Sequence, residues 1–120
     1  MGFSDLFKST KWSNKEINSL YYCLMGIGGV DGKLEKKEED TVREVISHLT
    51  GLKNRSEKYW YDLWKEVNKD SAADHINVLK SMHKKKRTFA LGSLGLVARA
   101  DGKLDPNELV LYESMENALK

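Results

Sequence analysis

Apolar residues recur along this chain at intervals of three and four positions, which is the period of an α-helix. The pattern covers 3–7, 14–30, 36–49, 54–69, 71–82, 88–100 and 106–119. The alternation typical of a β-strand is not sustained anywhere, and there is no Asn-Gly hairpin turn. The pattern therefore predicts an all-α fold of about seven helices.

Each predicted helix has one apolar face that we expect to be buried. The expected core residues are Ile17, Leu20, Tyr21, Leu24, Ile27, Val42, Val45, Ile46, Leu49, Tyr59, Trp60, Leu63, Trp64, Val67, Ala72, Ile76, Leu79, Met82, Leu109, Leu111 or Tyr112, Met115 and Leu119. Ser13 and Glu16 have the spacing of a helix capping box, and Asn54 and Glu57 have it again. Gly51 is expected to end the second long helix.

The four residues Asp-Gly-Lys-Leu occur twice, at 31–34 and at 101–104, so the two copies are 70 positions apart. Each copy follows an apolar segment rich in small residues and precedes a charged helical segment. This predicts a single domain over 1–120 with an internal pseudo-twofold repeat of helix–turn–helix. The first repeat covers about 14–50 and the second about 84–120.

Several glycines fall inside the predicted helices, where each weakens the helix by up to about 1 kcal/mol relative to alanine. They are Gly26, Gly28 and Gly29 in the first repeat and Gly92 and Gly95 in the second. A missing side chain lets two helices approach closely, so these positions predict tight helix packing. In the second repeat Ala98 stands where the first has Gly28, and the two are expected to meet at the pseudo-dyad.

Composition narrows the possible function. A net charge of +2 is too small to indicate a nucleic-acid partner by itself. The single cysteine, Cys23, cannot form a disulfide within the chain, which favours a reducing compartment. No apolar run is long enough to span a membrane, and the first residues do not read as a secretory signal. We therefore expect a cytoplasmic protein, for which the amphipathic stretch 3–7 either covers the core or contacts a membrane or partner.

A glutamate follows each repeated aspartate after seven positions: Glu38 follows Asp31, and Glu108 follows Asp101. This spacing equals the second half of an EF-hand calcium loop. The first half of such a loop is missing, since neither copy has the first two acidic ligands. The sequence therefore does not favour an ordinary EF-hand site.

Helix capping explains many of the same residues. Asp105 is a good N-cap, Pro106 is favoured at the first helical position, and Glu108 can accept a bond from the N–H of the cap residue. The alternative is that the four carboxylates come together, since a hard divalent cation would relieve their mutual repulsion. Both explanations remain open from the sequence.

The two turns share the form apolar-Asp-Gly-x-Leu-acidic-x-x-Glu, at 30–38 and 100–108. A small all-helical domain with two such turns resembles the TerB-like (tellurite-resistance) family, and the resemblance runs from Asn14 to the end. It implies a pseudo-twofold bundle of about seven helices in a bacterial cytoplasmic or membrane-associated protein of stress or tellurite response. It also implies acidic residues that bind divalent cations, which by position are Asp31, Glu38, Asp101 and Glu108.

A basic run consisting of Lys84, Lys85, Lys86 and Arg87 is a candidate contact for a partner. Tyr61 is another candidate, because it points away from the aromatic stripe of its helix. The alternative for the basic run is a solvated helix C-terminus, where cations are favourable. Binding of nucleic acid or of an anionic membrane surface would use the same run.

No enzyme signature appears in the sequence. The histidines lack the spacing of a metal-binding pair, and the serines lack a nucleophile-elbow motif. We expect a non-enzymatic module that acts by protein–protein interaction, with a divalent cation as its one candidate cofactor. The alternatives are a metal-dependent enzyme that uses the four carboxylates and a basic-patch binder of nucleic acid or membrane surfaces.

Overall fold

The computed structural model describes residues 11–29, 34–100, 102 and 106–120. Over these residues the chain forms six α-helices and no strand. They are α2 (Asn14–Gly28), α3 (Lys36–Thr50), α4 (Glu57–Val67), α5 (Ala72–Lys80), α6 (Lys84–Ala98) and α7 (Pro106–Leu119). The prediction of an all-α fold is confirmed. The short helix expected over 3–7 lies outside the described residues.

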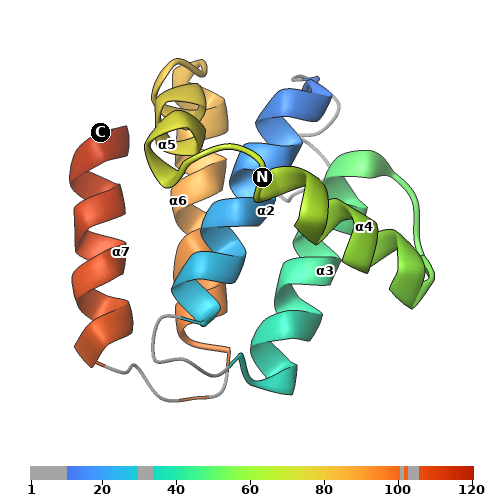
Figure 1. Ribbon diagram of the computed structural model, residues 1–120. Coiled ribbons are helices and arrows are strands. Elements are labelled where there is room, and N and C mark those ends of the chain that lie inside the picture. Colours follow the sequence, from blue (N-terminus) through green and yellow to red (C-terminus); the bar gives the residue numbers. More distant parts are fainter. Residues whose placement is uncertain (1–10, 30–33, 101, 103–105) are drawn as a thin grey trace.

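Helix α2 is the centre of the bundle and contacts each of the other five helices (Figure 1). Its residues Leu20, Leu24 and Ile27 have no exposed surface. Burying one such side chain contributes about 1.5–3 kcal/mol, so this one helix accounts for a large part of the core. Helices α2 and α3 form one antiparallel pair and α6 and α7 another. The ends of α2 and α6 and the starts of α3 and α7 lie at the same, lower end of the molecule in Figure 1.

Gly28 allows α2 to approach its neighbours closely. A Cβ atom built on Gly28 would lie 2.6 Å from Leu34 Cδ1, 3.3 Å from Val97 Cγ1 and 3.5 Å from Glu38 Cβ. The last residue of α2 is thus in contact with the start of α3 and with the end of α6. The close packing predicted for this position is confirmed.

The other helical glycines divide into two groups. A Cβ on Gly95 would lie 3.5 Å from the ring of Tyr112, so α6 and α7 pack tightly there. Gly26 and Gly92 are exposed, and a Cβ on either would have no neighbour within 4 Å. The prediction of tight packing was wrong for these two positions, because both lie on the outer face of their helix.

The predicted helix ends were mostly correct. The N–H of Glu16 donates to Ser13 Oγ over 3.2 Å, and the N–H of Ser13 donates to Glu16 Oε1 over 2.8 Å, which confirms the capping box. Gly51 ends α3 in the left-handed conformation, with φ of 72°. Asn54 is not the cap of α4, because the side chain of Ser56 accepts the bond from the N–H of Tyr59.

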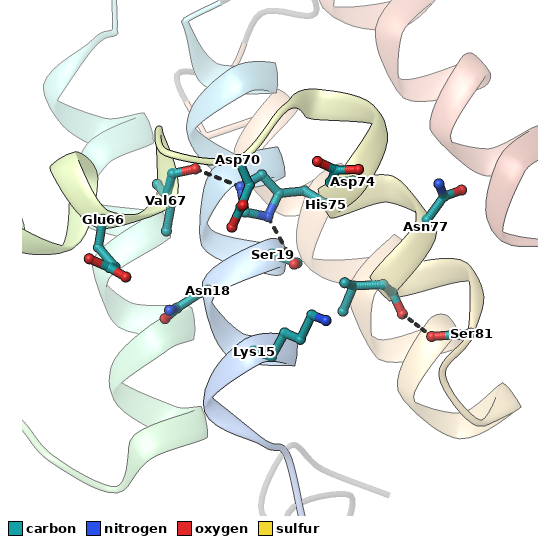
Figure 2. Close-up of a pocket in the computed structure, with 11 residues that line it drawn as sticks. Lys15, Asn18, Ser19, Glu66, Val67, Asp70, Asp74, His75, Asn77 and Ser81 are labelled. Carbon is teal, nitrogen blue, oxygen red and sulfur yellow. Dashed lines mark hydrogen bonds between the residues drawn. The ribbon is translucent and has the colours of Figure 1, made fainter.

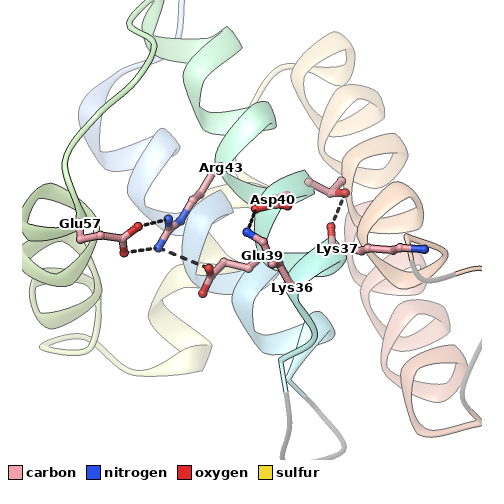
Figure 3. A network of polar contacts seen from close by, with 7 residues as sticks. Lys36, Lys37, Glu39, Asp40, Arg43 and Glu57 are labelled. Carbon is pink, nitrogen blue, oxygen red and sulfur yellow. Dashed lines mark hydrogen bonds and ion pairs between the residues drawn. The ribbon is translucent and has the colours of Figure 1, made fainter.

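A charged contact at the surface links α4 to α3 (Figure 3). The guanidinium of Arg43 donates to both carboxylate oxygens of Glu57, over 2.7 and 3.0 Å, and lies 3.6 Å from the carboxylate of Glu39. The same guanidinium lies 5.3 Å from the ring centre of Trp60, whose side chain is buried and stacks on Tyr21. Arg43 therefore connects the surface of α3 with the aromatic face of α4.

Three predicted core positions are wrong, namely Ala72, Leu109 and Trp64 of α4. Ala72 is exposed, and the first inward-facing residue of α5 is His75, four positions before the buried Leu79. Leu109 is 38% exposed, because the inward-facing position in the first turn of α7 is occupied by Glu108. Neighbouring residues of a helix point about 100° apart, so burial of Glu108 turns Leu109 toward solvent.

Glu16 and Lys86 form an ion pair between α2 and α6. The distance from Lys86 Nζ to Glu16 Oε1 is 2.8 Å, and the two side chains are 15% and 19% exposed. Burial by itself raises the pKa of Glu16. The hydrogen bonds from Lys86 and from the Ser13 N–H outweigh that effect, so the pKa lies below its ordinary value.

Replacing Glu16 with Gln tests this ion pair. Glutamine keeps an oxygen for the Ser13 N–H but loses the charge that faces Lys86. Because the pKa of Glu16 is lowered by folding, its charge stabilises the protein above the unfolded value of 4.5, and this stabilisation is lost as pH falls through the folded value. We expect a loss of about 1 kcal/mol at pH 7 and none at about pH 2, measured by urea unfolding.

The matched control for Glu16→Gln is Asp62→Asn, which removes an exposed ion pair with Lys58 within α4. Such exposed pairs contribute little to the free energy of unfolding. A loss of the same size at both pH values in Glu16→Gln would contradict a charge effect.

A pair of alanine substitutions tests the contact at Gly28. Gly26→Ala should raise the free energy of unfolding by up to about 1 kcal/mol, because it improves helix propensity and meets no neighbour. Gly28→Ala carries the same gain in propensity but forces Leu34 and Val97 to move. We expect Gly28→Ala to be less stable than Gly26→Ala by about 1–3 kcal/mol in chemical denaturation. Equal stabilities would show that the contact at Gly28 is loose.

Candidate functional site

Two buried carboxylates each lie in the first turn of a helix. Glu38, in the first turn of α3, is 1% exposed, and Glu108, in the first turn of α7, is 2% exposed. Both turns lie at the lower end of the molecule in Figure 1. The N–H of Glu35 donates to Glu38 Oε1 over 3.0 Å, so Glu38 caps the start of α3.

The predicted metal site also needs Asp31 and Asp101, which lie outside the described residues. Among the residues that the structure describes, no group of three His, Cys, Asp or Glu side chains is placed to hold a metal ion. The described residues by themselves therefore do not make a cation site, and one oxygen of Glu38 already accepts a backbone N–H. The site of four carboxylates stays a prediction.

The basic run is the first turn of α6, not the end of a helix. The helix begins at Lys84, and Nδ1 of His83 accepts a hydrogen bond from the N–H of Lys85 over 3.2 Å as its cap. The interpretation as a solvated helix C-terminus is therefore wrong. The error arose because the apolar pattern of this segment begins only at Phe89, one turn after the helix itself starts.

Positive charge at this position is electrostatically unfavourable for the fold. The N-terminal end of a helix carries a partial positive charge, so each cation there costs about 0.3–1 kcal/mol. The first turn of α6 contains no acidic residue. Lys86 pairs with Glu16, but Lys84 and Lys85 are exposed and form no ion pair with any described residue. We define Lys84, Lys85 and Arg87 as the basic turn.

Tyr61 points to solvent, as predicted, with 62% of its side chain exposed. The ammonium of Lys65 lies 5.2 Å from its ring centre. Trp64, predicted to be buried, is 38% exposed at the edge of the same helix. These residues belong to α4, whereas the basic turn belongs to α6, so the predicted partner contacts come from two different helices.

A polar pocket of about 690 Å³ lies between α2, α4 and α5 (Figure 2). Its rim carries the carboxylates of Glu66, Asp70 and Asp74 together with the amino group of Lys15. Lys69 forms an ion pair with Glu66 over 2.9 Å. The pocket has the volume of a small-molecule site, but most such sites have a predominantly apolar lining.

A buried serine and histidine lie beside this pocket. His75 Nε2 is 2.6 Å from the carbonyl oxygen of Val67, and Nδ1 is 2.9 Å from Ser19 Oγ (Figure 2). A carbonyl cannot donate, so Nε2 carries the proton and Nδ1 of the neutral ring accepts the hydroxyl proton of Ser19. The ring also stacks on Tyr22, with centres 4.4 Å apart. Both ring nitrogens are thus used to hold α5 against α2 and α4.

His75 was not singled out from the sequence. The spacing of 75, 79 and 82 places it on the same helical stripe as Leu79 and Met82, and both of these are buried. That spacing could have identified a buried histidine. It could not identify Ser19 or Val67 as its partners, because both come from other helices.

The comparisons with known proteins agree with this architecture. A family model described as "Tellurite resistance protein TerB" matches residues 18–120. A crystal structure of a protein of unknown function, PG1108 from Porphyromonas gingivalis W83, is similar with a TM-score of 0.73. It is 17% identical, and the match covers 92% of this chain and 86% of that one. No curated protein matches the sequence.

Proposed function

Since this chain belongs to the TerB family, we propose that it is a non-enzymatic module of tellurite resistance or a related stress response, which acts by binding a protein partner. The basic turn at the start of α6 is the observation that best supports this proposal. Residues that lower the stability of the fold at their own position are characteristic of functional surfaces. Lys84 and Lys85 are exposed cations at a helix N-terminus and have no acidic residue in the same turn.

The chemistry of the basic turn indicates an acidic partner. Backbone N–H groups at the start of a helix and side-chain cations attract the same anionic groups. A protein carboxylate is favoured over nucleic acid, because the whole chain has a net charge of only +2. Within the described residues no helix is long and apolar enough to cross a membrane.

The proposal includes an internal duplication of the fold. The bounds of α2 (14–28) and α6 (84–98) differ by 70 positions at both ends, and the starts of α3 and α7 differ by 70 as well. Glu16 and Lys86, which pair with each other, are also 70 positions apart. In a twofold arrangement, residues near the axis contact their own equivalents. The contacts of α3 with α6 and of α2 with α7 are equivalent under the same operation.

Two candidate nucleophiles are in positions that disfavour catalysis, which supports a binding role. Ser19 is 1% exposed and donates to a histidine whose other nitrogen is already bonded. Cys23 is buried, and burial raises the pKa of its thiol to about 12, so the reactive thiolate is scarce at neutral pH. A divalent cation on Asp31, Glu38, Asp101 and Glu108 remains part of the proposal as an optional component.

Charge reversal of the basic turn tests the proposed function. In Lys84→Glu/Lys85→Glu, affinity for poly-L-glutamate, used as an acidic polypeptide probe, should fall about tenfold or more at low salt, which equals about 1.4 kcal/mol. The melting temperature should rise, because acidic residues are favourable in the first turn of a helix. The control Lys37→Glu/Lys53→Glu changes the net charge equally at two exposed positions.

Equal loss of affinity in both variants would contradict a defined site at the basic turn. Salt-sensitive binding to duplex DNA, or to phosphatidylserine vesicles, without binding to poly-L-glutamate would favour the basic-patch alternative.

Glu38→Gln distinguishes capping from cation binding. A glutamine oxygen can still accept the Glu35 N–H, so capping predicts a free energy of unfolding within about 0.5 kcal/mol of the original. Because that bond is present in the structure, this is the outcome that we expect. A cation site predicts instead that calorimetric titration with calcium, magnesium or manganese gives heat and a higher melting temperature, and that Glu38→Gln removes both.

A further inference from the structure

One stripe of α6 faces solvent along the whole helix. Its members recur at intervals of three and four residues and are all exposed: Lys85, Thr88, Gly92, Leu96 and Arg99. Leu96 has 47% of its side chain exposed, and no atom lies within 4 Å of a Cβ built at Gly92. We call these five residues the α6 stripe. Its middle residue, Gly92, has no side chain, Leu96 is apolar, and the two end residues, Lys85 and Arg99, are positively charged.

The equivalent stripe of α2 is covered only in part, since Lys15 and Gly26 are exposed whereas Tyr22 lies under other helices. Subtracting 70 from each position gives Lys15, Asn18, Tyr22, Gly26 and Gly29. Tyr22 stacks on Trp64 of α4, with ring centres 6.4 Å apart, and on His75 of α5 at 4.4 Å. Lys15 and Asn18 line the pocket that α2 forms with α4 and α5. Helices α4 and α5 thus cover the middle of this stripe, at Tyr22.

A groove lies beside the α6 stripe, where α6 meets α3. It encloses about 440 Å³ and is lined mainly by apolar surface, to which Val45, Leu96 and Ala100 contribute. The polar residues that line the groove include Glu44, His48 and Arg99. In the described part of the chain no helix covers the middle of the α6 stripe, at Gly92, in the way that α4 and α5 cover Tyr22 of α2.

We propose that the α6 stripe and the α3–α6 groove form a docking surface for an amphipathic helix of an acidic partner protein. This inference rests on the proposed function and specifies its surface. The partner helix places an apolar side chain against Leu96 in the groove and carboxylates toward Lys85 and Arg99. These two cations are 14 positions apart, so the docked helix spans about 21 Å, which is about 14 residues.

The charges of the stripe argue for a different protein and against a second copy. If two copies packed with their α6 stripes antiparallel across a twofold axis, Lys85 of one would face Arg99 of the other. Like charges placed across an interface oppose association. An acidic helix meets both cations favourably, as amphipathic helices do when they bind in grooves of other proteins.

Nuclear magnetic resonance titration of the full chain with a synthetic peptide tests the proposal. The probe is an 18-residue helix with leucines at helical spacing flanked by glutamates; one control peptide has lysine for every glutamate, and another has serine for every leucine. We expect saturable shifts in the α6 stripe and around Val45 with the first peptide only. Leu96→Glu should weaken its binding at least tenfold, whereas Val110→Glu, at a residue 65% exposed on α7, should leave it unchanged.

Each other outcome overturns the inference in a recognisable way. Binding that depends on Lys84 and Lys85 but not on Leu96 removes the docking surface and leaves the proposed function standing. If the protein binds neither poly-L-glutamate nor the peptide, the docking surface and the proposed function are both wrong. Self-association that Leu96→Glu abolishes assigns the stripe to a second copy. Broadening of the stripe resonances by a spin label on Ser4→Cys assigns the stripe to the first residues of this chain.

Discussion

The close contact at Gly28 is the constraint on which the arrangement of the helices depends. There the end of α2 meets the start of α3 and the end of α6 at distances that leave little room for a side chain. This lets α2 lie inside the bundle, where five other helices surround it and bury its leucines completely. At the opposite end of the same two helices, the ion pair of Glu16 and Lys86 holds α2 and α6 together. The two contacts fix the relative position of the two antiparallel pairs.

The sequence predicted the helices well wherever an apolar face has a regular period. The bounds of α7 were predicted to the residue, and α2 and α3 to within two. The start of α6 was predicted too late, because its first four residues are basic and the apolar pattern begins only after them. The exposure of Leu109 was also not predicted, because local propensity does not indicate that the preceding Glu108 is buried. Both errors come from tertiary context, which outweighs local pattern.

The candidate sites were less accessible from the sequence than the fold. Exposure of Tyr61 was predicted from its position relative to the aromatic stripe, and the burial of Glu38 agrees with its capping role. The contact between Ser19 and His75 could not be predicted, because the residues are 56 positions apart and come from different helices. The spacing of 70 positions between α2 and α6 was visible in the sequence from the two copies of Asp-Gly-Lys-Leu. The sequence could not show that only α2 is covered on its outer face, at Tyr22, because this depends on where α4 and α5 lie in the fold.

The central position of α2 has a consequence for how the molecule is made. Its apolar residues are synthesised before α6 and α7, which help to enclose them and begin 70 and 92 positions after α2 begins. At a ribosomal rate of about 5–20 residues per second, the nascent chain carries this uncovered helix for several seconds. During that interval α2 is a natural binding segment for chaperones. Truncated chains that end before α6 retain this exposure permanently, so a nascent product released early is a substrate for proteolysis.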